Sequence, residues 1–230
     1  MKQIVTKGIV LSRTDYGESD RILNVLTPDN GKISLMAKGT RKIKSKLAGG
    51  IELFCLSDIT FLVGKGDMGN LISSRLITYY GNIVTDLDRV QLGYKLIKML
   101  NRATEAHTEE GYFELLDKSF EALNNLELDI DLILFWFEAQ LLKLSGHSPN
   151  LKYDQAEKKL LEDVSYNFDY ENMSFVSSAE GKFNSKHIKT LRLLFSNNLP
   201  KEISKVNNLL TTIKDVSPII TTSLSTYIRL

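Results

Sequence analysis

The chain has 230 residues, of which 43% are hydrophobic and 25% are charged, with a net charge of +1. This composition is ordinary for a globular protein and excludes disordered and fibrous classes. The single cysteine, Cys55, excludes an internal disulfide, and its apolar neighbours favour a buried residue over a nucleophile. The chain start lacks the apolar core of a signal peptide and no segment is suited to span a membrane, so we expect a cytoplasmic protein.

Charge divides the sequence into two parts of opposite sign. Residues 1–80 contain 12 Lys and Arg against 7 Asp and Glu, a net of +5, whereas residues 81–230 contain 17 against 21, a net of −4. This asymmetry predicts a basic, anion-facing domain over residues 1–80 and a second domain over residues 81–230 with another task.

The basic part contains short runs rich in Val, Ile and Leu, each bounded by turn residues. These runs predict five strands, at residues 4–13, 21–27, 32–38, 51–63 and 71–79. The sequence Pro28-Asp29-Asn30-Gly31 between the second and third runs is a strong hairpin signal. Because no helical crossover is evident and closure removes exposed strand edges, we predict a small five-stranded antiparallel barrel.

A cationic segment, KGTRKIKSK at residues 38–46, lies between the third and fourth predicted strands. A flexible cationic loop on a rigid barrel can follow a phosphate backbone, because each neutralised phosphate releases condensed counterions. A solvated surface loop is the ordinary alternative, and composition alone leaves both open. The candidate binding residues are the six cations between residues 32 and 46, where there is no carboxylate: Lys32, Lys38, Arg41, Lys42, Lys44 and Lys46.

The aromatic residues of this part are not clustered with the cations along the sequence. They are Tyr16, Phe54, Phe61, Tyr79 and Tyr80. Base stacking on aromatic rings is therefore not expected to dominate. We expect binding that is mainly electrostatic, weakly selective for sequence and steeply dependent on salt.

The residues Gly64 to Gly69 match the dinucleotide-binding pattern G-x-G-x-x-G. That pattern binds a pyrophosphate only when a strand precedes it and a helix follows it. Here residues 70–79 have a strand-like sequence, which favours a hairpin loop. A nucleotide-dependent enzyme remains an alternative, and failure to bind nucleotide would remove it.

From Asp86 onward the apolar residues repeat at about 3.6 rather than two positions, which predicts helices. The apolar face of the first is marked by Val90, Tyr94, Ile97 and Leu100 or Asn101. The helix at 129–145 is apolar almost all round, so it should form the centre of an α-helical domain, with Trp136 in the core and Gly146 as its C-terminal cap. The other predicted helices lie near 113–123, 188–195 with Asn184 or Ser185 as cap, 203–213, and from a Ser217 cap with Pro218 at the first helical position.

Several short motifs of residues 8–42 occur together in a distinctive order. They are GIVL at 8–11, YGESD at 16–20, LT at 26–27, GKI at 31–33 and AKGTRK at 37–42. In order and spacing they resemble the N-terminal domain of the RecO recombination mediator family. The resemblance implies an α+β protein, in which an OB-fold barrel that binds single- and double-stranded DNA is followed by an α-helical domain.

The resemblance also implies a function in DNA repair and homologous recombination. RecO proteins anneal complementary strands coated by single-stranded DNA-binding protein (SSB), and with RecR they help RecA load onto such strands. The expected partners are therefore DNA, RecR, the SSB C-terminal tail and, indirectly, RecA, with no membrane, in a nucleoid-associated cytoplasmic protein that is not an enzyme. A different class, an adaptor whose basic loop meets an acidic protein, is the alternative; salt-sensitive DNA binding without that protein would argue against it.

The sequence GHSPNL at 146–151 resembles the G-x-x-P-x-L element that opens a cysteine-rich zinc-binding insertion in many RecO proteins. Residues 147–178 contain no cysteine, and tetrahedral zinc needs four ligands. The remaining candidates, Cys55, His107, His147 and His187, are widely separated, so we predict a zinc-free variant without a cofactor. A small hairpin with Val164, Tyr166 and Phe168 facing Met173, Phe175 and Val176 is expected to hold this segment instead.

In the family, the helical domain receives the acidic, Phe-terminated tail of SSB in an apolar pocket edged by cations. Chemically suitable cations in this chain are Lys186, Lys189, Arg192 and Lys205, although solvated helix faces are the favoured interpretation for each of them. No catalytic constellation stands out, because none of the three histidines has an evident nucleophile beside it.

Overall fold

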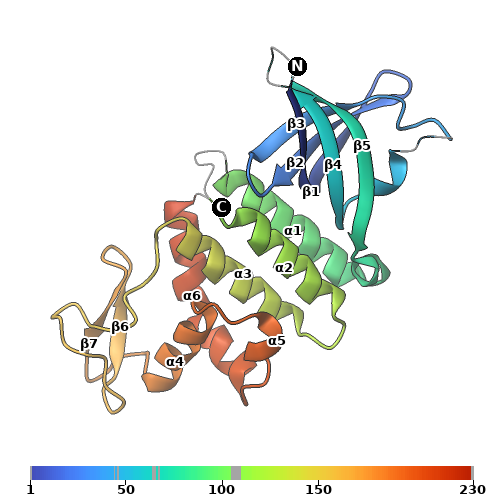
Figure 1. Cartoon of the computed structure of the whole chain (residues 1–230). Helices are drawn as coiled ribbons and strands as arrows, with labels where there is room; N and C mark the ends of the chain where they lie inside the picture. The colour runs from blue at the N-terminus through green and yellow to red at the C-terminus, as the bar shows by residue number, and fades with distance from the viewer. Residues whose placement is uncertain are drawn as a thin grey trace. The chain divides into compact units, whose positions relative to one another are not determined.

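The computed structural model describes residues 2–43, 45, 47–63, 66, 68–104 and 110–228 (Figure 1). Its contacts divide the chain into two compact units, Met1–Asn124 and Asn125–Leu230. The sequence places a domain boundary near Gly81, where the last strand of the barrel has just ended. By contacts, however, the two helices that follow the barrel belong to the same unit as the barrel.

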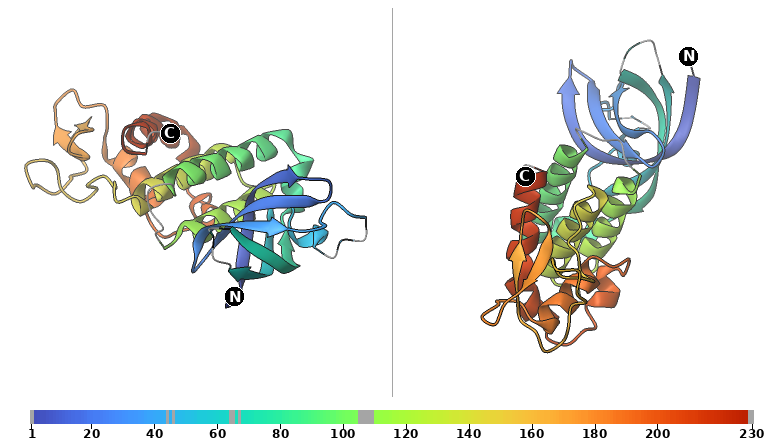
Figure 2. Two further views of the ribbon diagram at one scale, coloured as in Figure 1. Left: turned by 90° about the horizontal axis from the view of Figure 1, so that it is seen from above. Right: turned by 90° about the vertical axis from the view of Figure 1, so that its left-hand side faces the viewer.

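The first unit is built on a closed five-stranded barrel in the strand order β1-β2-β3-β5-β4, whose strands curl round one another (Figure 2). The strands are β1 Lys2–Tyr16, β2 Asp20–Thr27, β3 Gly31–Ala37, β4 Cys55–Val63 and β5 Met68–Tyr79. All neighbours are antiparallel except β3 and β5, which are parallel, so the expected wholly antiparallel barrel is wrong at one pair. The reason is geometric: an odd number of strands cannot alternate in direction all the way round a ring.

The parallel contact between β3 and β5 is short and includes a glycine. It runs over Ser34–Met36 against Met68–Asn70, with Leu35 opposite Gly69. A Cβ at Gly69 would lie 2.8 Å from Leu35 Cδ2 and 3.2 Å from the Leu62 carbonyl oxygen of β4, so a larger residue would force the Leu35 side chain to move and would crowd the backbone of β4.

This placement gives the glycine-rich pattern a structural role. Its last glycine closes the barrel, and the strand β5 follows where a dinucleotide-binding site would need a helix. The sequence prediction that residues 70–79 form a strand is confirmed. Gly64, Lys65 and Asp67 of the pattern lie outside the described residues.

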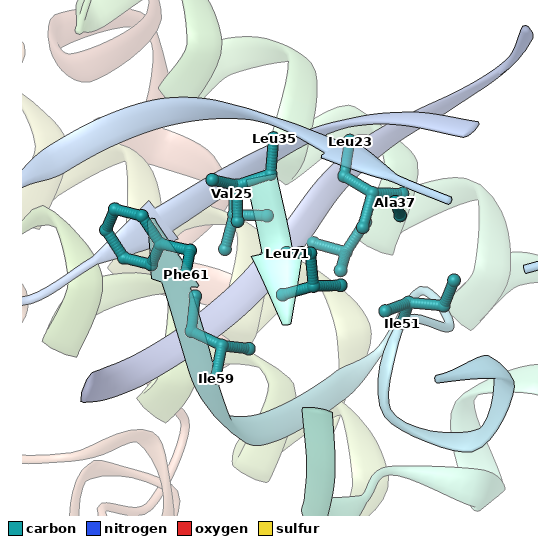
Figure 3. Packing of buried hydrophobic residues seen from close by; sticks show 9 residues of the cluster. Leu23, Val25, Leu35, Ala37, Ile51, Ile59, Phe61 and Leu71 are labelled. Atoms are coloured by element: carbon teal, nitrogen blue, oxygen red, sulfur yellow. The ribbon is translucent and has the colours of Figure 1, made fainter. Parts of the chain in front are cut away.

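The interior of the barrel is filled by alternate residues of its strands (Figure 3). Leu23 and Val25 of β2 face Leu35 and Ala37 of β3, and Ile51 packs at the same core from just after the 3-10 helix η1 (Ala48–Gly50). The other members of the cluster are Val10, Ile59, Phe61 and Leu71. Because successive side chains of a strand point to opposite sides, this inward set fixes which residues face outward.

The helices α1 (Leu87–Ala103) and α2 (Tyr112–Asn124) share a core with the barrel; a 3-10 helix, η2 (Gly81–Thr85), connects β5 to α1. The ring of Phe54, just before β4, makes edge-to-face contacts with Tyr94 of α1 at 5.5 Å and with Phe120 of α2 at 5.3 Å between centroids. This aromatic contact explains why the barrel and these helices form one unit.

The inward face of α1 is the expected one only in part. Ile97 and Leu100 are buried as expected, but Tyr94 is half exposed and Val90 only partly buried, and Leu96 is buried instead. Apolar residues occur on both sides of this helix, so their periodicity alone could not select the buried side.

The second unit is organised around α3 (Ile130–Leu144), as expected. Asp129 caps its first turn by accepting from two backbone amides, and Gly146 ends it with a φ of +80°, a conformation that glycine adopts without strain. Trp136 is buried and its indole N–H donates to the Asn198 carbonyl oxygen at 2.9 Å, which confirms its place in the core. Packed on α3 are α4 (Ser185–Leu194), capped by Asn184, α5 (Pro200–Ile203) and α6 (Leu209–Tyr227).

The last helix corrects two sequence predictions. The predicted helix at 203–213 is interrupted after α5, and α6 then runs through Pro218, where a new helix was expected to begin. Proline lacks the amide that would bond the carbonyl oxygen four residues earlier, that of Lys214. The Ser217 hydroxyl donates to that oxygen at 2.9 Å, so the carbonyl is satisfied and the helix continues.

A small hairpin, β6 (Tyr166–Asp169) and β7 (Ser174–Ser177), occupies the cysteine-free segment for which the sequence predicts a hairpin. Phe168 pairs with Phe175 as expected, but Tyr166 pairs with Ser177 rather than with an apolar residue. The Phe175 ring is buried and contacts those of Tyr166 at 6.1 Å, Phe168 at 5.1 Å and Phe183 at 6.1 Å. Aromatic rings therefore hold this hairpin.

Two features of the described residues bear on function. Among them, no three His, Cys, Asp or Glu side chains gather as a metal site would require, and the absence of zinc stays a prediction. Within the same residues, no helix combines the length and the apolar character needed to cross a lipid bilayer.

Candidate nucleic-acid interface

The outward-facing side chains of β1, β2 and β3 form a surface that we call the outer face. Residues that pair across antiparallel strands point to the same side of the sheet. The outer face consists of Ser12, Thr14 and Tyr16 of β1, Asp20, Ile22 and Asn24 of β2, and Lys32, Ser34 and Met36 of β3, followed by Lys38; Leu26, which pairs with Lys32, is buried. Lys32 and Lys38 mark its two ends, which six residues of extended chain separate by about 20 Å.

The middle of the outer face is a polar row across three strands. Asn24 donates from Nδ2 to Ser12 Oγ at 2.9 Å and accepts from Ser34 Oγ at 2.8 Å. These two hydrogen bonds link the side chains of Ser12, Asn24 and Ser34 into a row across the three strands. The row offers hydrogen-bonding groups between the cationic ends of the face.

At the end marked by Lys38, Asp20 holds the start of the basic loop. Its Oδ1 accepts from the Gly39 amide at 2.8 Å and from Ser19 Oγ at 3.0 Å. The Gly39 amide, and then the Ser19 hydroxyl and the charges of Lys38 and Lys42, hold the pKa of the Asp20 carboxyl below its ordinary value. The carboxylate therefore positions Lys38 and Lys42 beside the outer face.

Arg41 ties the same loop to the β1–β2 turn. Its backbone amide donates to the Ser19 carbonyl oxygen at 3.0 Å, its Nη1 donates to Gly17 O at 3.3 Å, and its Nε lies 3.6 Å from Asp15 Oδ2. Arg21 foremost, and Arg41 beside it, lower the pKa of the Asp15 carboxyl. Arg41 is thus partly neutralised by its own chain and has a structural role in addition to any contact with a ligand.

The predicted site residues fall into separate groups. Lys38 and Lys42 are exposed at the loop end, and no ion pair joins them to another of the described residues. Lys32 lies at the opposite end, where its Nζ is 3.4 Å from the carbonyl oxygen of Asn101 near the end of α1. Lys44 and Lys46 lie outside the described residues. Of the described cations, Lys38 and Lys42 therefore lie at one end of the outer face and Lys32 at the other.

Sequence reasoning missed one aromatic residue of this surface. Tyr16 pairs with Asp20, so its side chain lies on the outer face at the end where the basic loop begins, and it is 56% exposed. The expectation that the aromatic residues lie apart from the cations is wrong for Tyr16. The register of the two hairpins could have revealed this position. Because β1 pairs with β2 and β2 pairs with β3, residues 16 and 38 lie at the same end of the sheet.

Cys55 takes no part in this surface. It is buried, as its apolar neighbours indicated, and burial raises the pKa of its thiol to about 11. A thiol with so high a pKa is almost entirely protonated near neutral pH and is a poor nucleophile.

The first unit thus carries a closed barrel with the strand order of an OB-fold, a class of fold that binds oligonucleotides across strands 2 and 3. Residues 1–80 match the family model described as "Recombination protein O N terminal", and residues 84–230 match "Recombination protein O C terminal". The chain belongs to the RecO family, which confirms the resemblance seen in its sequence.

Curated relatives agree with this assignment. The chain is similar to the protein named DNA repair protein RecO in Dehalococcoides mccartyi, with 34% identity over 70% of this chain and 64% of the relative. Proteins of the same name are 35% identical in Bacillus pumilus, over 64% of this chain and 57% of the relative, and 31% identical in Halalkalibacterium halodurans, over 74% and 66%. The chain thus spans less than two thirds of the length of the D. mccartyi relative.

Proposed function

We propose that this protein is a DNA repair and recombination mediator that binds single- and double-stranded DNA on the outer face of its barrel. One observation carries the proposal: Lys38 and Lys42 are exposed at one end of that face, Lys32 lies at the other, and the polar row of Asn24 lies between them. Family membership and the name of the relatives support the same conclusion.

The proposed mechanism is non-covalent. Two DNA strands repel each other through their phosphates, and cations that neutralise some of these phosphates lower the repulsion. Complementary strands held at the outer face can then pair. The protein anneals strands in this way without forming a covalent intermediate and without a cofactor.

The proposed partners are those that the resemblance to the RecO family suggests. In this proposal residues 1–80 hold DNA, while residues 81–230, with a cysteine-free remnant of the zinc insertion at about 147–178, bring the protein to DNA coated by SSB. With RecR, the protein helps RecA load onto that DNA. Its place is the cytoplasm, at the nucleoid.

A cavity of about 570 Å³ in the second unit suits the SSB tail. Phe168, Phe183 and Pro218 provide apolar walls for a terminal phenylalanine, and Lys182 provides a cation for acidic residues. Two cations singled out in the sequence are engaged elsewhere: Lys189 contacts Glu162 at 2.6 Å, and Arg192 donates to the Leu151 carbonyl oxygen. Lys182 is therefore the better candidate.

Neutralising the loop-end lysines tests the DNA-binding proposal. Each lysine that contacts a phosphate contributes about 0.7 to the slope of log affinity against log salt on single strands and about 0.9 on duplex. The double variant Lys38→Gln and Lys42→Gln should therefore bind unrelated sequences about equally more weakly and lose about 1.4 to 1.8 of this slope. Fluorescence anisotropy with labelled oligonucleotides at several salt concentrations measures both quantities.

A matched control removes two exposed lysines of the second unit, Lys201→Gln and Lys205→Gln, which changes the net charge by the same amount. The control should keep the slope of the natural protein. An unchanged slope in the Lys38 and Lys42 variant would contradict the proposed contact. Salt-sensitive binding of naked DNA by the natural protein would argue against an adaptor that needs an acidic protein partner. Strand annealing with and without SSB then tests the mediator activity itself.

A further inference from the structure

We propose that Tyr16 and Ile43 contact the bases of single-stranded DNA, so that the loop end of the outer face binds unpaired bases as well as phosphates. This inference rests on the proposed function and names the form of DNA that the site prefers. It adds two apolar contacts to a surface for which the sequence predicts mainly electrostatic binding.

The position of Tyr16 supports a stacking role. Its ring is 56% exposed on the outer face, and its partner Asp20 contacts the first residues of the basic loop. The Gly39 amide, directly after Lys38, donates to Asp20, and the Lys42 amide donates to the Gly39 carbonyl oxygen at 3.2 Å, so the backbone of both lysines is tied to the strand pair that carries Tyr16. An aromatic ring beside cations is the arrangement on which successive bases stack in single-strand binding proteins.

Ile43 extends this surface from the loop. Its side chain is fully exposed, directly after Lys42. The segment before it is held in place, because Gly39 is bonded to Asp20 and Arg41 to Ser19. A fully exposed isoleucine on a held, cationic segment is placed to pack against the face of a base whose phosphate a neighbouring lysine contacts.

Exposed apolar residues are common one at a time, so exposure alone carries no argument. Tyr16 and Ile43 differ from such isolated residues because they stand beside lysines that form no ion pair with a described carboxylate. A single strand presents the complementary combination of apolar base faces and charged phosphates. A duplex hides its base faces by stacking and pairing, so contacts from Tyr16 and Ile43 favour single strands, whereas contacts to phosphates alone would favour the higher charge density of duplex.

The test compares an oligothymidylate with an oligonucleotide of equal length whose sugars carry no bases. Both probes have the same phosphates, so only the first can stack. In the full-length protein, Tyr16→Leu should weaken binding of oligothymidylate about 5- to 100-fold, as expected for the loss of stacking on one base, and leave binding of the abasic probe within about twofold. Tyr16→Phe, which keeps the ring, should bind both probes like the natural protein.

Two further variants sharpen the test. Ile43→Ser should weaken oligothymidylate binding by a smaller factor, about two- to fivefold, since an aliphatic side chain covers less of a base. The control Tyr79→Leu removes a tyrosine that is similarly exposed, at 51%, but stands at the end of β5 and not on the outer face; it should change neither affinity. Fluorescence of 2-aminopurine within the oligonucleotide, which reports base stacking, should change on binding to the natural protein and much less with Tyr16→Leu.

The outcomes separate this inference from the proposed function. If the natural protein binds both probes and Tyr16→Leu lowers both affinities equally, or neither, the inference is overturned while DNA binding stands. If the natural protein binds neither probe, the proposed function fails and the inference fails with it. Selective loss on the base-bearing probe supports both.

Discussion

The two units hold their protruding segments in different ways. In the first unit, charged and polar contacts hold the basic loop: Asp20 binds the Gly39 amide, and Asp15 lies beside Arg41. In the second unit, the hairpin of β6 and β7 is held by buried rings around Phe175. A loop tied by polar contacts can keep its lysines at the surface, while a hairpin tied by rings needs no metal ligand. The stability of the first arrangement should depend on pH and salt, whereas that of the second should depend on how well the buried rings fill the core.

The largest effect is expected from the ring cluster of the second unit. Phe175→Ala removes a fully buried ring and should lower the free energy of unfolding by about 3 to 5 kcal/mol, measured by urea denaturation. The loss should be nearly the same at low and high salt, because it arises from packing. A metal chelator should leave the stability of the natural protein unchanged, and stoichiometric zinc in the purified protein would contradict the zinc-free interpretation. A loss below about 1 kcal/mol would show that the rings do not hold the hairpin.

A smaller effect is expected from the charged tie of the first unit. Arg41 is 39% exposed and its contact to Asp15 is long, so Arg41→Gln should cost less than about 1 kcal/mol of stability, and less still at high salt. In DNA binding, we expect Arg41→Gln to reduce the salt slope by less than Lys42→Gln does, since Asp15 partly neutralises the guanidinium. If Arg41→Gln reduced the salt slope more than Lys42→Gln, Arg41 would be a main phosphate contact, and its mainly structural role would be contradicted.

The smallest effect is expected from pH. The pKa of Asp20 is lower in the folded protein than its ordinary value of 3.8, chiefly because the Gly39 amide donates to it. The carboxylate therefore contributes stability above pH 3.8, and this contribution is lost as the pH falls through the lowered value of the folded state. The natural protein should exceed Asp20→Asn in stability at pH 7, and the difference should shrink in acid. A difference that grows in acid would reverse the assigned sign.

Local signals in the sequence predicted much of this fold. Alternating apolar residues gave the five strands, Pro28 to Gly31 gave the hairpin turn, and Asp129 and Gly146 marked the two ends of α3. Each of these signals acts within a few residues of the structure that it determines. The run of cations at residues 38–46 likewise indicated the loop that lies beside the outer face.

Features that depend on contacts distant in sequence could not be predicted in this way. The parallel contact of β3 with β5 follows from ring closure, which no single strand encodes. Tyr16 joins Lys38 only through two successive strand pairings, and Lys32 is separated from the loop because β3 runs the length of the face. Pro218 stays within a helix because the Ser217 hydroxyl replaces the amide donor that proline lacks. Proline usually marks the start of a helix, so the sequence pattern predicted a new helix at this position.

The short pairing of β3 with β5 is the contact that closes the barrel. Among the described residues, opening the barrel at this contact breaks only the bonds between Ser34–Met36 and Met68–Asn70, which are fewer than those of any other pair of neighbouring strands. Ser34 and Met36 also belong to the outer face. A DNA strand bound across β2 and β3 would therefore contact the part of β3 that pairs with β5. A ligand that binds only the closed barrel stabilises the closed barrel. The pairing of β3 with β5 should therefore open less often when a ligand occupies the outer face.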